Sequence, residues 1–205
     1  MILLSTAYFP SISWMALFAQ NKEVHIDLYE SYQKQSYRNR FHIATSHGLL
    51  ALSVPVKKPK GNQSKSNEIL IDYQQNWQSL HWKSIKTAYQ SAPFFLYYQD
   101  DIEALIKKKY HSLHEMNEHI LIELATLIGI SSGIKYTTDF HPINQLENDF
   151  RFLIHPKKVT PLDMENYYQI FDTSLGFISN LSVLDLLFNL GPEALPYLES
   201  LKLKK

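Results

Sequence analysis

The sequence predicts an α+β or irregular α/β fold, with a mixed β-sheet in the N-terminal half and a mainly α-helical C-terminal half. Two observations lead to this prediction. Short apolar or alternating segments, separated by turn residues, fill residues 2–72, whereas apolar side chains recur at helical spacing from Trp77 onward. Strands that precede helices, instead of alternating with them, are typical of α+β proteins. A chain of 205 residues can bury a full core, and without a clear internal boundary we expect a single domain over residues 1–205.

The N-terminal half is expected to hold five strands and one short helix. The sequence VHIDL alternates apolar and polar residues, which favours a half-buried strand, and Ser46-His47-Gly48 is typical of a hairpin turn. A lysine-rich loop follows the hairpin, and the strand after this loop is expected to share a sheet with the hairpin. The expected strands are 2–8, 24–28, 41–44, 49–56 and 68–72, the helix is 12–19, and the loop is 57–67.

The C-terminal half is expected to be helical, with an irregular segment at 136–148. Asn180 is predicted to cap the helix that follows it, because a short polar side chain at that position accepts a backbone N–H. Gly191 and Pro192 then end this helix. The expected helices begin at Trp77 and near Pro93, cover 113–130 and 181–190, and end with one that reaches about residue 201.

The charge balance and the lack of cysteine exclude several classes of protein. Lys plus Arg and Asp plus Glu both number 20, so no general electrostatic attraction to nucleic acid is expected. Without cysteine there are no disulfides, thiolate metal sites or cysteine nucleophiles. The sequence has no GxGxxG, P-loop or GxSxG motif and leaves the cofactor unknown. Its apolar runs are too short and interrupted to span a bilayer, and it shows no targeting pattern, so we expect a cytoplasmic protein without membrane insertion.

Basic side chains alternate along the segment SYRNRFHI. If the segment continues the strand that follows, Arg38, Arg40 and His42 share one face. Arginines in such a row bind phosphate, pyrophosphate or carboxylate groups, so we predict that Arg38 and Arg40 hold an anionic substrate. We further predict that Tyr8 and Asn39 orient this substrate. The alternative is the solvated face of an edge strand, whose arginines pair with nearby acids.

His81 lies at the margin of an aromatic helix face. A histidine beside a cleft can serve as a general acid–base, and His81 is predicted as a catalytic residue on this ground. The alternative is a core histidine that hydrogen-bonds a backbone carbonyl. Lys83 and Lys86 point away from the apolar side of the same helix and are expected to face solvent.

The segment 181–190 carries a single polar stripe, formed by Ser182, Asp185 and Asn189. Asp185 is predicted as the second catalytic residue, and a buried carboxylate there would need a partner such as Arg38 or Arg40. The favoured alternative is that the stripe is the only solvent-facing side of the helix.

A second stripe carries side chains of the types that bind zinc: His111, His114, Glu115 and Glu118. Its pattern is not HExxH, and the apolar residues of the same helix lie opposite and must face the core. The stripe is therefore expected to face water, and no metal site is predicted.

Several segments together resemble the WbqC-like protein family over nearly the whole chain. They are STAYFPSISWMALF at 5–18, SYRNRFHI at 36–43, HWKSIKTAYQSAPFF at 81–95 and GFISNLSVLDLLFNLGPEAL at 176–195. DFRFLIHPKK at 149–158 and NYYQIF at 166–171 are similar to the branch of the family found in Bacteroidetes. Many relatives begin with a His-Gln-Pro-x-Tyr-x-Pro-Trp pattern. This chain has Ser5-Thr6-Ala7-Tyr8-Phe9-Pro10-Ser11 there and lacks the histidine and the glutamine.

The resemblance implies a bacterial protein associated with surface-polysaccharide or O-antigen gene clusters. One function class is a transferase-like enzyme that acts on a small anionic or phosphate-bearing molecule, such as a nucleotide-linked sugar. The other is a non-catalytic binding or assembly protein of the same pathway. The enzyme is favoured if the predicted residues converge on an open cleft, and the binding protein is favoured if they disperse or are fully paired in the core. The residues in question are Arg38, Arg40, His81 and Asp185.

Overall fold

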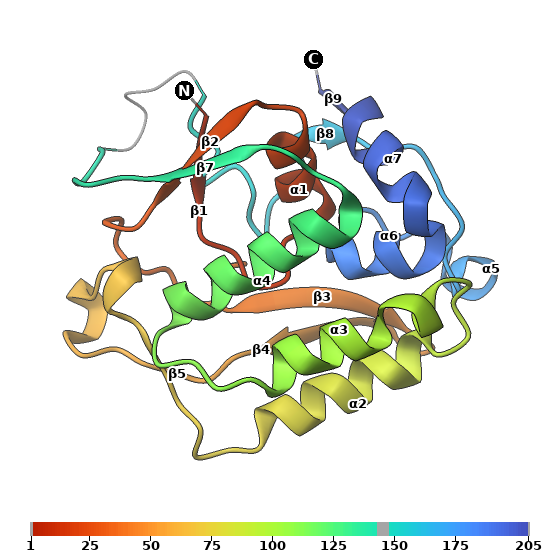
Figure 1. The fold of residues 1–205 in the computed structure, drawn as a ribbon, viewed down its shortest axis with the longest axis horizontal. Helices are drawn as coiled ribbons and strands as arrows, with labels where there is room; N and C mark the ends of the chain where they lie inside the picture. Colours follow the sequence, from red (N-terminus) through yellow and green to blue (C-terminus); the bar gives the residue numbers. More distant parts are fainter. Residues whose placement is uncertain (1, 143–147, 205) are drawn as a thin grey trace.

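The computed structural model describes residues 2–142 and 148–204, and it confirms the α+β fold class. A parallel three-stranded sheet lies near the N-terminus, with the strand order β1-β2-β7 (Figure 1). Its strands are β1 (Leu3–Ser5), β2 (Glu23–Asp27) and β7 (Gly133–Tyr136). Helix α1 (Ile12–Ala19) connects β1 to β2, since parallel neighbours need a crossover rather than a tight turn.

The loop between β1 and α1 is anchored to a distant part of the chain. Phe9 has a φ of +41°, a conformation that is strained for a bulky side chain and persists only where the surroundings hold it. The Phe9 carbonyl accepts a hydrogen bond from Ser182 Oγ at 3.1 Å, and the Pro10 carbonyl accepts the Val183 N–H at 2.8 Å. The predicted strand 2–8 is therefore shorter than expected, because the chain leaves the sheet after Ser5 to make these contacts.

An antiparallel hairpin forms a second sheet. Strands β3 (Arg40–Thr45) and β4 (Gly48–Ser53) pair with Phe41 opposite Leu52, and both of these side chains are buried. The hairpin is as predicted, but the strand after the lysine-rich loop does not join it. That strand, β6 (Leu70–Ile71), pairs instead with β5 (Val56–Lys57). The loop between β5 and β6 contains the 3₁₀ turns Gly61–Gln63 and Ser66–Glu68.

Three longer helices complete the middle of the chain: α2 (Trp77–Tyr89), α3 (Phe95–Lys107) and α4 (Leu113–Ile128). The buried face of α2 packs against α3 and the hairpin strand β3 (Figure 1). Helix α4 begins where Ser112 Oγ accepts the Glu115 N–H at 3.1 Å, and it ends at Gly129, whose φ is +88°.

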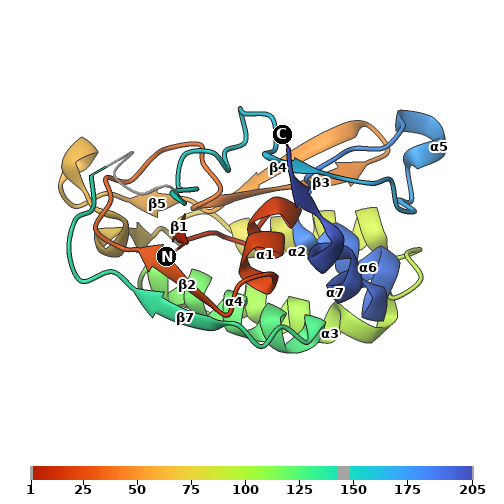
Figure 2. The same cartoon turned by 90° about the horizontal axis from the view of Figure 1, so that it is seen from above.

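The C-terminal segment returns to the N-terminal sheet. It contains β8 (Leu162–Asp163), α5 (Asp172–Leu175), α6 (Val183–Leu190), α7 (Ala194–Ser200) and β9 (Lys202–Leu203), with a 3₁₀ turn at Gly191–Glu193. Strands β8 and β9 pair with each other, and α7 packs on α1 (Figure 2).

Two features of local structure differ from the prediction. Strand β7 was not predicted; it ends at Tyr136, and the described residues after it, 137–142 and 148, are irregular as expected, while residues 143–147 lie outside the described residues. Asn180 does not cap α6. The helix begins one residue after Ser182, whose Oγ accepts the Leu184 N–H at 3.3 Å, while the Asn180 side chain accepts the Ser13 N–H.

Candidate functional site

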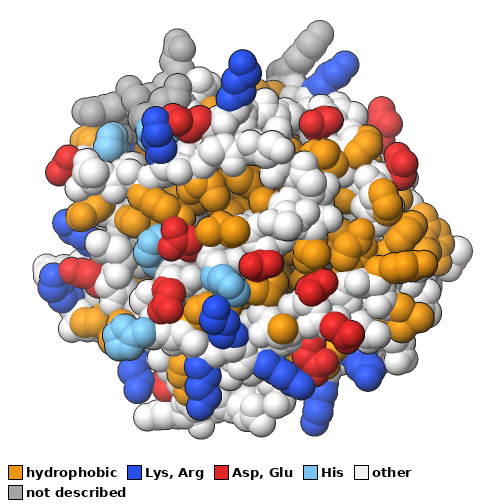
Figure 3. All heavy atoms as spheres, viewed as in Figure 1, with side chains coloured by type: hydrophobic (Ala, Val, Ile, Leu, Met, Phe, Trp, Pro, Cys, Tyr) orange, Lys and Arg blue, Asp and Glu red, His pale blue; other side chains and the backbone are white. Residues whose placement is uncertain are grey.

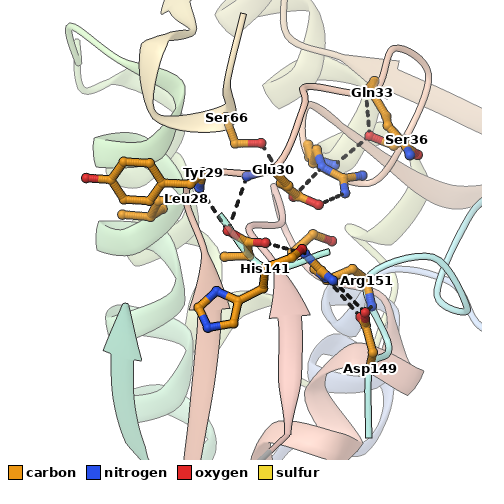
Figure 4. Close-up of polar contacts among 12 residues, drawn as sticks. Leu28, Tyr29, Glu30, Gln33, Ser36, Ser66, His141, Asp149 and Arg151 are labelled. Atoms are coloured by element: carbon orange, nitrogen blue, oxygen red, sulfur yellow. Dashed lines mark hydrogen bonds and ion pairs between the residues drawn. The ribbon is translucent and has the colours of Figure 1, made fainter. Parts of the chain in front are cut away.

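A buried charge cluster occupies the carboxyl edge of the parallel sheet. It consists of Asp27, Glu30, Arg38, Asp149 and Arg151, all nearly inaccessible to solvent (Figure 4). Asp27 is the last residue of β2, which places its carboxylate at the edge where open α/β sheets carry their ligand sites. Of these five residues, only Arg38 was predicted from the sequence as a site residue.

Arg38 and Glu30 form one half of the cluster. Arg38 donates from Nε to Glu30 Oε1 at 2.7 Å and from Nη2 to Oε2 at 2.5 Å, and the exposed fractions of the two side chains are 1% and 2%. Ser66 Oγ donates to the same carboxylate at 3.4 Å. Burial raises the pKa of Glu30, and the neighbouring Arg38 opposes that rise. The Arg38 guanidinium is thus committed to an internal partner.

Arg151 joins the other two acids. It donates from Nε and Nη2 to the Asp149 carboxylate at 2.9 and 2.6 Å, and from Nη1 to Asp27 Oδ2. Asp27 Oδ1 in turn accepts the Tyr29 N–H at 2.8 Å and the Thr137 hydroxyl at 3.0 Å. This half therefore joins the end of β2 to the segment after β7 and to residues 149–151.

Arg40 differs from the two cluster arginines because no carboxylate of the described residues lies within ion-pair distance of it. It is half-buried at the start of β3, and its Nε donates to Ser53 Oγ at 2.8 Å. Burial lowers the pKa of His42, two residues away, and the positive charge of Arg40 lowers it further. Because β3 begins at Arg40, the row predicted for Arg38, Arg40 and His42 does not form on one strand face.

Asn39 and His81 meet the same end of the hairpin. Asn39 Nδ2 donates to the Val54 carbonyl at 2.8 Å, and its buried Oδ1 has no partner among the described residues. The His81 imidazole hydrogen-bonds the backbone of Ser53, and its Nδ1 lies 3.1 Å from the Tyr8 hydroxyl. Burial is the main reason why the pKa of His81 falls to about 4, so the ring is neutral at pH 7.

A cavity of about 300 Å³ adjoins His81, with Ser53 and Trp77 in its wall. The side chain of His81 is only 1% exposed, so the ring forms part of the floor of the cavity without projecting into it. The Trp77 indole N–H is buried and has no partner within the part of the chain that the structure describes.

Asp185 is buried in a third environment. Its Oδ1 accepts the Tyr89 hydroxyl at 2.9 Å, and its Oδ2 accepts Gln169 Nε2 at 2.9 Å as well as the Tyr167 hydroxyl. Burial raises the pKa of Asp185 even though these three donors lower it. The prediction that the stripe on this helix faces solvent was wrong, because Ser182, Asp185 and Asn189 are all buried. The expectation of an arginine partner was wrong as well, because neutral groups fill that role.

The structure thus gathers some of the predicted site residues and separates others. Tyr8 and His81 hydrogen-bond each other, and Asn39 and Arg40 hydrogen-bond residues 54 and 53. Arg38 belongs to the buried charge cluster, and Asp185 to the tyrosine pocket. In the sequence, Asp27 in VHIDL and the pair Asp149 and Arg151 in DFR were signals for the cluster, but nothing in either segment indicated that the two segments meet.

Three residues of the predicted zinc-type stripe, His114, Glu115 and Glu118, lie on α4, and His111 precedes the helix. His114 pairs with Glu118 at 3.9 Å on the helix surface. Residues 2–142 and 148–204 contain no group of three His, Cys, Asp or Glu side chains arranged to hold a metal ion. Over the same residues, no helix has both the length and the apolar character that crossing a membrane requires. Figure 3 shows acidic and basic side chains interspersed on the face that it presents, in keeping with the zero formal net charge.

Together these features define an α+β protein with a small parallel sheet, a buried charge cluster at the carboxyl edge of that sheet, and a polar site at one end of an adjoining hairpin. Comparison with known proteins identifies the family to which this chain belongs. The chain belongs to the WbqC-like protein family, whose sequence profile matches residues 6–160. It is also 28% identical to the Mycobacterium tuberculosis protein named "Uncharacterized protein Rv1507c", over 82% of this chain and 83% of that protein. No solved structure matches the chain.

Proposed function

We propose that this protein binds a small anionic molecule at Arg40 and serves as a non-catalytic binding or assembly protein of bacterial surface-polysaccharide biosynthesis. One observation carries the proposal: Arg40 is a half-buried arginine without a carboxylate partner among the described residues. The pathway is supported by the family, whose members are associated with surface-polysaccharide gene clusters.

The chemistry of Arg40 suits an anion. Its Nε is engaged by Ser53, which fixes the orientation of the planar guanidinium and leaves its terminal nitrogens for a phosphate or carboxylate. Partial burial strengthens such a charge-assisted pair relative to one in bulk water. A nucleotide-linked sugar is one molecule of this class.

A binding role is favoured over catalysis because the proton-handling candidates are already saturated. His81 is hydrogen-bonded to Tyr8 and to the backbone of Ser53, and Asp185 accepts three internal hydrogen bonds. Neither side chain can exchange a proton with a ligand unless these contacts break.

A transferase is the second candidate, and one observation supports it. Neutral His81 borders a cavity whose wall also holds the unpartnered Trp77 N–H. A substrate in this cavity would meet an imidazole in the basic form, as general base catalysis requires. In this alternative His81 removes the proton from the attacking group; Arg40 does not line this cavity.

Calorimetric titration tests the proposal. Inorganic phosphate, pyrophosphate, a nucleotide-linked sugar and the corresponding neutral sugar are titrated into the wild-type protein and two variants. The variants are Arg40→Met and the control Lys107→Met, which removes an exposed cation from α3. We expect an anion to bind the wild type and the control, and to bind Arg40→Met about tenfold more weakly or worse. Equal affinity in Arg40→Met, or the absence of any response to the anions, would refute the anion site.

Two further measurements separate binding from catalysis. An anion beside Arg40 favours the protonated ring of His42, so the pKa of His42 should rise on binding, as followed by NMR. Turnover that disappears in His81→Asn while ligand affinity persists would favour the transferase over the binding protein.

A further inference from the structure

A second cavity, of about 620 Å³, lies at the turn end of the hairpin. The turn between β3 and β4, the C-terminal half of α2 and the residue before α5 enclose it, and Figures 1 and 2 both show these elements on the same side of the molecule. Its volume falls within the range of small-molecule sites. We call it the turn groove. It is distinct from the cavity beside His81, which lies at the opposite end of β4.

The α2 wall of the turn groove carries polar side chains that have no internal partners. Lys83, Ser84 and Thr87 line the groove from adjacent positions on the helix surface. In the described part of the chain, none of the three side chains makes a hydrogen bond or an ion pair. Three donors therefore face one space without a protein acceptor.

No carboxylate lines the turn groove or the cavity beside His81, in contrast to three other cavities of the described chain. Glu199 borders two of those cavities, and Asp101 and Glu123 border a third. The formal net charge of the whole chain is zero, so an acid-free groove beside a lysine is a local departure from the average. Its electrostatic character suits an oxyanion.

Apolar surface also lines the turn groove: Leu50 from β4, Phe171 from the residue before α5, and Ala88 from α2 itself. The hairpin turn adds the polar side chains of Thr45, Ser46 and His47, so a ligand there meets hydrocarbon as well as an ammonium and hydroxyls. An oxyanion without an apolar body would leave the apolar surface in water, and a neutral apolar molecule would leave the three α2 donors without an acceptor.

We propose that the turn groove binds a small amphipathic anion, namely a carboxylate or phosphate monoester that carries an apolar chain. The oxyanion head contacts Lys83, Ser84 and Thr87, and the chain packs against Leu50 and Phe171. This site is independent of the anion site at Arg40 and uses different residues, so either can fail while the other holds.

Calorimetric titration with octanoate, octyl phosphate, octanol and inorganic phosphate, below the concentrations at which they form micelles, tests the turn groove. Three variants are compared with the wild type: Lys83→Met, Phe171→Ala, and the control Lys86→Met. Lys86 is exposed on the same helix and does not line the groove, so it matches the charge change without touching the site. Thermal unfolding of each variant verifies that it is folded.

We expect at least one of the two octyl anions to bind the wild type and Lys86→Met with equal affinity. Loss of the Lys83 contact should weaken this binding about tenfold or more, because hydrogen bonds to charged groups contribute more than neutral ones. Octanol and inorganic phosphate should each bind the wild type more weakly than the octyl anion, and Phe171→Ala should weaken the octyl anion as well. Comparison of octanoate with octyl phosphate then identifies the preferred head group.

Any one of three outcomes would overturn the proposal: octanol binds as tightly as the octyl anions, Lys83→Met retains the wild-type affinity, or neither octyl anion binds within its soluble range.

Discussion

Removing Arg38 while Glu30 remains should destabilise the fold strongly. In Arg38→Met the Glu30 carboxylate stays 2% exposed but loses both charge-assisted hydrogen bonds, at 2.7 and 2.5 Å. Hydrogen bonds to charged groups contribute about 1.5–3 kcal/mol each. Breaking one member of a buried ion pair costs about 3–5 kcal/mol. We therefore expect a loss of about 3–5 kcal/mol in the free energy of unfolding at pH 7, a large part of the about 5–15 kcal/mol typical of folded proteins.

The loss of stability in Arg38→Met should grow as the pH rises. Burial already raises the pKa of Glu30 above the ordinary value of 4.5, and removal of Arg38 raises it further. Above pH 4.5 the unfolded chain releases the Glu30 proton while the folded variant retains it, so the variant loses stability as the pH rises from 4.5 towards the raised pKa. The difference between wild type and variant should consequently be smaller at pH 5 than at pH 7.

Urea unfolding followed by circular dichroism, at pH 5 and pH 7, measures this effect. The control is Lys60→Met, which breaks the exposed pair with Glu68 and should cause no measurable loss. The double variant Arg38→Met/Glu30→Met removes both charges and should be more stable than Arg38→Met alone, because no unpaired carboxylate remains buried. A loss in Arg38→Met no greater than in the control, or one that does not shrink at pH 5, would refute the reasoning.

Three other predictions rest on single positions. The NMR signals of the His81 ring should show a neutral imidazole from pH 8 down to pH 5, since burial lowers its pKa to about 4; a titration near the ordinary 6.5 would contradict this. Asp185→Ala should reduce the free energy of unfolding by about 2–4 kcal/mol, because three buried donors lose their acceptor; urea unfolding that matches the wild type would contradict it. Gly191→Ala should destabilise more than Gly176→Ala in the same assay. Both glycines have positive φ, but only a Cβ at Gly191 would meet the Phe94 ring, at 2.5 Å, so equal losses would exclude the clash.

Local patterns in the sequence were enough to predict most elements. The helix 12–19 matches α1, and the apolar periodicity around 113–130 predicted α4 to within two residues. Ser46-His47-Gly48 correctly indicated the hairpin turn. Such signals depend on neighbouring residues alone, so a sequence contains them in full.

Pairing between distant segments could not be predicted in the same way. Strand β7 has only four residues, too few for their alternation to be a clear signal, and it exists because β2 supplies its hydrogen-bond partners. Likewise β5 and β6 pair with each other and not with the hairpin. Short strands take their stability from neighbours that the local sequence does not identify.

The candidate site residues show the same difference between what local sequence indicates and what contacts between distant segments decide. The sequence by itself determined which side chains were unusual: the arginines of SYRNRFHI, the histidine on an aromatic helix, and the aspartate in an apolar one. Only the tertiary structure decided what each of them contacts. It placed Arg38 against Glu30 and Asp185 against two tyrosines, and it left Arg40 without a carboxylate among the described residues. The physical reason is that the energy of a charge depends on burial and on partners from distant segments, both of which exist only after the chain has folded.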